Sequence, residues 1–263
     1  MIQPANRVTE IQEYYFSRKL KEVAKLNAEG QDIISLAIGS PDMPPSKQTI
    51  DTLCEVAHNP AAHGYQPTVG IPELRKAMAG YYKRWYDVDL DWATEIQPLI
   101  GSKEGILHVT LAFCNPGDEV LIPNPGYPTY TAINKILGTK ITYYDLREDN
   151  EWQPDFEALE KMDLSHVKLM WTNYPNMPTG GVAKMETYER LVKFAKDHNR
   201  GGERQPLFAH PQRASAEHHA GAGRQGLLHR IQFAQQEPQH AGMACGYDFE
   251  QQAVYLLDPE GEE

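Results

Sequence analysis

Apolar and polar positions follow two different periods along the first three quarters of the chain. Four short apolar runs are typical of buried strands, at residues 96–100, 119–123, 140–144 and 168–172. Between or after them, apolar residues recur at the spacing of amphipathic helices, at about residues 103–113, 127–137, 154–161 and 184–198. This alternation predicts βαβ units, and therefore an α/β fold with a parallel-rich sheet flanked by helices.

Three further elements are predicted upstream of these runs. Residues 8–28 have the pattern of an amphipathic helix that ends near Gly30, and residues 33–38 read as a short apolar strand. Residues 71–86 begin with Pro72 in a first turn and place their apolar residues on one face, which predicts another helix.

The sequence changes character at residue 200. Residues 1–199 contain 14 lysines, whereas residues 200–263 contain none. These last 64 residues also hold 9 of the 16 glutamines and 5 of the 10 histidines, and they lack a periodic apolar pattern. We therefore divide the chain into an N-terminal part, residues 1–199, and a tail, residues 200–263, for which we expect no regular packing.

Composition argues against several classes of protein. The net charge of −11 disfavours nucleic acid or an anionic membrane as a partner, and 41% hydrophobic residues fit a soluble globular protein. No apolar run approaches the roughly 18 residues of a membrane span, and the polar start lacks the apolar stretch of a signal peptide. The three scattered cysteines and the five tail histidines lack ligand spacing, so we expect a cytoplasmic protein without disulfides or metal.

Two loops at predicted strand ends carry candidate chemistry. In residues 100–105 (IGSKEG) a glycine turn opens a helix, whose N-terminal N–H groups suit a phosphate, and Ser102 adds a hydroxyl. The alternative is an ordinary helix cap by Ser102. In residues 123–130 (PNPGYPTY), Tyr127 is placed to lie against a flat heteroaromatic ring, or alternatively to pack at the edge of the core.

Three other segments add polar groups and glycines. Residues 173–181 (NYPNMPTGG) follow another predicted strand and are either a ligand-binding loop or a Pro-rich turn. Residues 36–42 (LAIGSPD) contain Gly39, where a bare backbone can approach a small anion. Residues 64–70 (GYQPTVG) precede the helix predicted at 71–86.

Together, these segments resemble the fold-type-I, class I/II aminotransferases that use pyridoxal 5'-phosphate (PLP), over residues 10–199. The matching elements are L-x-x-G-x-P-D, Y-x-x-x-x-G-x-x-x-L-R, G-S-K-E-G, D-E-V, P-x-Y-P-x-Y and N-x-P-T-G. The resemblance implies part of a PLP-transferase large domain in a homodimer that moves an amino group from an amino acid to a 2-oxo acid. A PLP-dependent C–S β-lyase and a non-catalytic PLP-fold fragment are the alternatives, because they would share these loops.

The resemblance also implies roles for single residues. Ser102 and Lys103 would hold the PLP phosphate, and Tyr127 would stack on the pyridine ring. Tyr65 would reach the phosphate bound by the partner subunit. The Gly39 N–H would meet the substrate α-carboxylate, and Tyr14 or Tyr15 would line the substrate pocket in the manner of the diaminopimelate-type members.

One position departs from the family pattern. The family usually carries Asn before P-T-G, where it hydrogen-bonds the phenolic oxygen of the cofactor, and this chain has Met177 there. We expect the neighbouring Asn176 to substitute for it.

The tail lacks the lysine that the family's chemistry requires. The resemblance implies a Schiff-base lysine, an Asp on the pyridine nitrogen and an Arg on the phosphate, all within the stretch that is lysine-free here. We therefore expect weak or absent PLP binding and little or no activity from the chain as written.

A shifted reading frame accounts for this loss. With suitable codons, the next frame reads V-V-N-D-N-P-Y from Gly201 and S-L-S-K-S-H-N-M-P-G-W-R-A-G-M over residues 233–247. The lysine codon would straddle Gln236 and Glu237. We predict that the tail is out of frame and the large domain incomplete; the alternative is a divergent natural extension.

Overall fold

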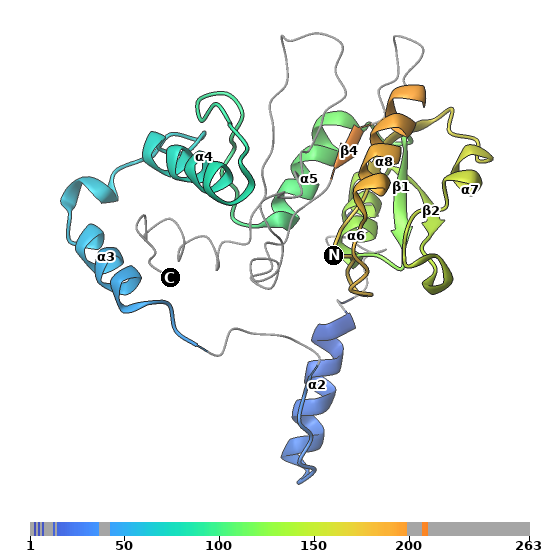
Figure 1. The fold of residues 1–263 in the computed structure, drawn as a ribbon. Helices are drawn as coiled ribbons and strands as arrows, with labels where there is room; N and C mark the ends of the chain where they lie inside the picture. Colours follow the sequence, from blue (N-terminus) through green and yellow to red (C-terminus); the bar gives the residue numbers. More distant parts are fainter. Residues whose placement is uncertain are drawn as a thin grey trace.

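A four-stranded parallel sheet, with strand order β2-β1-β3-β4, lies at one side of the molecule among the helices that pack on it (Figure 1). The computed structural model describes residues 3, 5, 7, 13, 15–36, 43–198 and 207–209. The strands are β1 (Glu119–Asn124), β2 (Lys140–Asp145), β3 (Val167–Trp171) and β4 (Leu207–Ala209). In β1, only Asn124 is exposed, because the strand lies between β2 and β3 and is covered on both faces.

Helices cover both faces of the sheet. The flanking helices are α5 (Ser102–Phe113), α6 (Pro128–Leu137), α7 (Phe156–Glu160) and α8 (Met185–His198). Val120 and Ile122 of β1 belong to the core formed with α5 and α6, whereas Leu121 belongs to the core formed with α7 and α8. Successive strand side chains point to opposite faces, so one strand serves both cores.

The boundaries of the flanking helices follow from local residue chemistry. Asp155 precedes α7 and accepts a hydrogen bond from the Ala158 N–H at 3.0 Å, as an N-cap residue should. Pro128 opens α6, where its missing N–H costs nothing, and Gly138 ends the helix with φ of 74°.

The helices before the sheet are much less buried. These are α2 (Tyr15–Ala28), α3 (Lys47–Ala57) and α4 (Pro72–Tyr86), and short 3₁₀ turns lie at Pro60–His63 and Glu148–Asn150. In Figure 1, α2 and α3 stand apart from the sheet. Among described side chains, α2 has none that is buried and α3 has only Thr49.

Strands β1, β2 and β3 confirm the parallel-rich α/β prediction, but two predicted strands are wrong. Residues 96–100 are irregular because Pro98 lacks an N–H and the Ile96 carbonyl accepts from Arg75 Nε at 3.1 Å. Residues 33–36 are also irregular, with Leu36 93% exposed. No strand among the described residues pairs with them.

One helix was missed, although its signal is in the sequence. Helix α3 begins after Ser46, whose side chain accepts from the Thr49 N–H at 3.1 Å. Ser46 is therefore an N-cap residue of the ordinary type, and Ile50 and Leu53 follow at helical spacing.

The tail contributes one described element. Leu207–Ala209 pairs in parallel with β3, so this tripeptide is an exception to the expectation of a tail without regular packing. The remaining tail residues, including Gln236 and Glu237, lie outside the described residues.

Candidate functional site

The candidate loops gather at one edge of the sheet. The loop with Tyr127 follows β1 and the loop with Asn176 follows β3, both at carboxyl ends of parallel strands. Ligands of open α/β sheets bind at this edge. Ser102 opens α5, which packs against α6 and β3.

The start of α5 keeps the features expected of an anion site. Gly101 occupies the cap position, and no side chain caps the helix. The alternative in which Ser102 serves as a cap is therefore not seen, since Ser102 is the first helical residue. Glu104 instead accepts from the Ile100 N–H at 2.6 Å, outside the first turn. The first N–H groups of a helix have no acceptor within it, so Ser102 and Lys103 stand where an anion is favoured.

Tyr127 is the N-cap residue of α6 and packs at the edge of the core, as one of its two interpretations predicted. Its half-buried ring packs against the core and meets the Tyr130 ring edge-on, with centroids 5.8 Å apart. The turn before it requires Gly126, because a Cβ there would lie 2.3 Å from the Pro123 carbonyl oxygen. The ring is thus held in one place, and its exposed part remains able to contact a ligand.

Asn176 is the most enclosed polar residue of the third loop, with 2% of its surface exposed. Its N–H donates to the Gly181 carbonyl at 2.7 Å, and its carbonyl accepts from the Gly180 N–H at 2.7 Å. Its side-chain Oδ1 accepts from Thr179 Oγ1 at 2.8 Å. The side-chain amide is consequently fixed in orientation, and Nδ2 makes no hydrogen bond.

Met177 does not take over the polar role of the family Asn. Its backbone N–H donates to Asn173 Oδ1 at 3.2 Å, and its side chain is half-buried. A thioether is only a weak acceptor and has no N–H to donate. Any hydrogen bond donated by a side chain at this point of the loop must come from a neighbour of Met177.

A second unpaired donor lies beneath the loops. Trp171, the last residue of β3, has its Nε1 buried without a partner, and its ring stacks on Tyr130 with centroids 5.0 Å apart. The Tyr130 hydroxyl also lacks a well-formed hydrogen bond. Burial raises the pKa of Tyr130 far above its ordinary value, and the Asn173 side chain opposes this only in part.

These unpaired atoms test whether the site suits PLP. A buried donor without an acceptor costs about 1–3 kcal/mol, so such atoms commonly mark the place of an absent partner. An anion-binding helix start, an aromatic ring and a buried amide donor match the phosphate, pyridine ring and phenolic oxygen of PLP. The described residues therefore fit the group.

Other predicted site residues are not brought into this cluster. Tyr65 lies in the loop before α4 and is 97% exposed, so it does not close over the site of its own chain. Gly39 and Tyr14 lie outside the described residues. Trp171 beneath the loops was not among the predicted site residues, and its position in the predicted strand 168–172 was its only signal, whereas Asn173 belongs to the candidate loop 173–181.

The described part of the chain has neither a cluster of metal ligands nor a helix able to span a membrane. Its His, Cys, Asp and Glu side chains form no group of three able to hold a metal ion. None of its helices combines the length and apolar character needed to cross a membrane.

Comparison with known proteins identifies the family. Residues 31–200 match the sequence model of the family "Aminotransferase class I and II". The chain belongs to this family. Its members use PLP, which agrees with the group that the cluster fits.

Curated relatives match most of the chain at moderate identity. The LL-diaminopimelate aminotransferase of Dehalococcoides mccartyi is 42% identical over 195 residues, which cover 74% of this chain and 50% of the relative. The enzyme of the same name from Moorella thermoacetica is 42% identical over 198 residues, with coverages of 75% and 51%. The chain thus spans about half the length of these relatives.

Solved structures support the fold. Substrate-bound BacF from Bacillus subtilis aligns with a TM-score of 0.71 at 36% identity, covering 80% of this chain and 52% of that one. The alanine aminotransferase of Pyrococcus furiosus aligns with a TM-score of 0.69 at 28% identity, with coverages of 78% and 51%.

Proposed function

We propose that the described residues form the PLP-binding part of an aminotransferase, which moves an amino group from an amino acid to a 2-oxo acid. One observation carries this proposal: a helix start suited to phosphate, a fixed aromatic ring and a buried unpaired amide lie on loops at one sheet edge. The names of the curated relatives make LL-diaminopimelate the first amino donor to test.

Each residue then has a specific task. The N-terminal turn of α5 at Ser102 and Lys103 would hold the phosphate, and Tyr127 would lie against the pyridine ring and exclude water from it. The unpaired Nδ2 of Asn176 would donate to the phenolic oxygen in place of the family Asn, where this chain has Met177. When bound, PLP supplies an electron sink that stabilises negative charge at the substrate α-carbon.

The substrate side of the site rests on residues outside this cluster. We assign the Gly39 N–H to the substrate α-carboxylate and Tyr14 to the wall of the substrate pocket. In a homodimer, Tyr65 contacts the phosphate held by the other subunit, and its 97% exposure in a single chain leaves it accessible for that contact.

The proton transfer at the α-carbon requires a base that the printed tail does not supply. Residues 200–263 contain no lysine, and the family match ends at residue 200. Both facts support a single-base frame shift near codon 200. We accordingly expect the chain as written to bind PLP weakly and to turn over no substrate.

A non-covalent analogue tests the binding part of this proposal. The full chain is titrated with 4'-deoxypyridoxine 5'-phosphate, which has the ring and phosphate of PLP but no aldehyde. Asn176→Leu removes the donor and should weaken binding about tenfold, since one hydrogen bond is lost and an acceptor is left unpaired. Tyr143→Phe is the control, because Tyr143 lies on β2 and its hydroxyl pairs with Thr131 at 3.1 Å.

The same titration can refute the proposal. If the analogue binds no more tightly than inorganic phosphate, the site is not a PLP site. If Asn176→Leu and Tyr143→Phe have equal affinities, Asn176 does not contact the ring. For the lysine, borohydride reduction with PLP followed by mass spectrometry should show no single predominant lysine adduct; one dominant adduct with turnover would contradict an inactive chain.

A further inference from the structure

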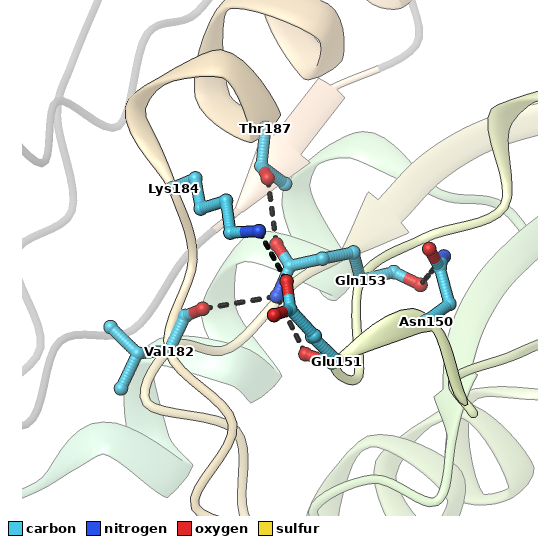
Figure 2. A network of polar contacts seen from close by, with 6 residues as sticks. All are labelled: Asn150, Glu151, Gln153, Val182, Lys184 and Thr187. Carbon is cyan, nitrogen blue, oxygen red and sulfur yellow. Dashed lines mark hydrogen bonds and ion pairs between the residues drawn. The ribbon is translucent and has the colours of Figure 1, made fainter. Parts of the chain in front are cut away.

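A network of hydrogen bonds behind the third loop joins two segments that are distant in sequence. Figure 2 shows Gln153, which follows a tight turn, reaching Val182, just before α8, and Thr187, in the first turn of α8. We propose that Gln153 and Thr187 form a clamp that positions the Asn176 amide for the cofactor. This inference rests on the proposed function only for the identity of the ligand.

Gln153 uses its whole side-chain amide in this clamp. Its Nε2 donates to the Val182 carbonyl at 3.0 Å and to the Glu151 carbonyl at 2.8 Å. Its Oε1 accepts from Thr187 Oγ1 at 2.6 Å. Thr187 is only 5% exposed, so water competes poorly for this bond. A glutamine with all three contacts made has one available orientation.

The turn that carries Gln153 is itself held in an uncommon conformation. Glu151 and Trp152 have φ values of 51° and 59°, in the left-handed region that residues other than glycine rarely adopt. The Trp152 N–H donates to the Arg147 carbonyl at 2.8 Å, and Asn150 Nδ2 donates to the Gln153 carbonyl at 3.0 Å. Such conformations persist where the surrounding contacts fix them.

Trp152 connects this turn to the Asn176 loop. Its side chain packs on Gly181 so closely that a Cβ at Gly181 would lie 2.6 Å from Trp152 Cβ. The Tyr174 hydroxyl donates to the Trp152 carbonyl at 3.0 Å. The loop is therefore supported near its start at Tyr174 and near its end at Gly181.

The path from the clamp to the Asn176 amide is short. Val182, which accepts from Gln153, is bonded in sequence to Gly181, and the Gly181 carbonyl accepts from the Asn176 N–H. Releasing Val182 and Thr187 would let this end of the loop move. The unpaired Nδ2 of Asn176 would then lose its fixed direction, because a donor must be held in place to favour one acceptor position.

The experiment compares three single variants of the full chain by hydrogen–deuterium exchange with mass spectrometry. Thr187→Val keeps the shape but removes the hydroxyl, Thr187→Ser keeps the hydroxyl, and Lys184→Ala removes an exposed ion pair with Glu151 in the same network. Thr187→Val should speed exchange in peptides covering residues 174–181 about three- to tenfold, the ratio set by one net hydrogen bond. Thr187→Ser and Lys184→Ala should exchange like the parent chain.

A second readout separates positioning from general stability. Affinity for 4'-deoxypyridoxine 5'-phosphate should fall in Thr187→Val by a similar factor and recover in Thr187→Ser. Peptides from α6, residues 128–137, should exchange at the parent rate in all variants. A further variant, Gln153→Glu, keeps the acceptor for Thr187 but loses both hydrogen bonds that Nε2 donates. It should show the same faster exchange, and it provides a second test if Thr187→Val does not fold.

Distinct results overturn the clamp and the proposed function. Unchanged exchange over residues 174–181 in Thr187→Val or Gln153→Glu, or an equal rise in α6, would exclude a clamp for this loop. If the exchange changes as expected but the parent chain does not bind the analogue, the clamp stands and the PLP assignment fails.

Discussion

Apolar side chains are mostly buried in the sheet region, residues 102–198, and mostly exposed in the N-terminal region of α2 and α3, residues 15–57. In the sheet region, Val120 and Leu169 are fully buried and Trp171 is 2% exposed. In the N-terminal region, Leu36 is 93% exposed and Leu53 is 56% exposed. Both regions have amphipathic helices, so the difference does not come from the helical pattern.

What differs is whether a partner surface is present. Helices α5, α6, α7 and α8 pack on the two faces of the sheet, and each contributes buried residues to one of the two cores, although Leu111 and Phe113 of α5 remain exposed. No described residue covers α2 or the apolar face of α3 to a similar degree. Amphipathic helices gain most of their stability from such packing, so a helix can be correctly patterned and still lack its contact surface.

The largest effect should come from restoring the reading frame. A single-base change near codon 200 that recovers the lysine codon across Gln236 and Glu237 should convert an inactive chain into one that transaminates. By the family resemblance, the restored sequence and a second subunit should also cover α2 and α3, so exchange in residues 15–57 should slow by orders of magnitude.

Two measurements check this first prediction. The coding DNA should contain a longer open frame that one insertion or deletion restores; its absence would favour a divergent extension. Hydrogen–deuterium exchange of residues 15–57 is measured before and after restoration, with β1 as the reference. If restoration does not slow exchange in residues 15–57, a missing partner surface is not the reason that these helices are exposed.

Truncating one leucine in each region should sharpen the comparison of packing. Leu169→Ala leaves a cavity in a closed core and should lower the free energy of unfolding by about 2–5 kcal/mol. Leu53→Ala removes a half-exposed side chain and should change it by less than about 0.5 kcal/mol. Urea denaturation followed by tryptophan fluorescence measures both, and similar losses would mean that α3 is packed as firmly as β3.

A smaller loss of folding stability should appear at acidic pH, and it arises from Glu119 in the sheet region. Glu119 begins β1 with its side chain 5% exposed, accepting from Lys140 Nζ at 2.8 Å and from Thr142 Oγ1. Burial raises its pKa, but these two hydrogen bonds more than offset it and hold the pKa below the ordinary 4.5. The folded state therefore prefers the ionised form more than the unfolded state does.

The sign of the pH dependence follows from that preference. The stabilisation by Glu119 is complete above pH 4.5 and is lost as the pH falls through the lower folded-state pKa. Glu119→Gln should lower the free energy of unfolding by about 1–2 kcal/mol at pH 7. The variant should also lose less of its remaining stability than the parent chain when the pH falls below 4.5. Thermal unfolding at pH 7, 5 and 3.5 tests it, and an unchanged pH slope in Glu119→Gln would remove Glu119 as the cause.

Three strands of the sheet were predictable because apolar, aromatic and β-branched residues dominate residues 119–123, 140–144 and 168–172, and the structure has β1, β2 and β3 there. Two of these strands, β1 and β3, are almost entirely buried, whereas β2 is largely half-buried or exposed. Residues 96–100 show the same pattern without forming a strand, since Pro98 and the Arg75 contact remove the required backbone groups. An apolar run alone therefore specifies neither a strand nor complete burial, since Ile100 in this run is 76% exposed.

The motifs named Ser102, Tyr127 and Asn176 as site residues, and their binding roles stay predictions. The structure shows that Ser102 begins α5 and that Tyr127 and Asn176 lie after β1 and β3. That Asn176 Oδ1 is taken by Thr179 while Nδ2 has no partner depends on side-chain orientations within the loop. No spacing in the sequence encodes which atom of an amide is satisfied.

Sequence alone determined the family, the order of strands and helices in the sheet region, and the lysine-free tail, because these depend on local patterns and on residue identity. Only the tertiary structure decided that Gln153 hydrogen-bonds to Thr187, 34 positions away, and that the apolar faces of α2 and α3 lie uncovered among the described residues. Both depend on contacts between distant segments. A sequence pattern shows that a residue requires a partner, whereas the folded chain determines which residue provides it.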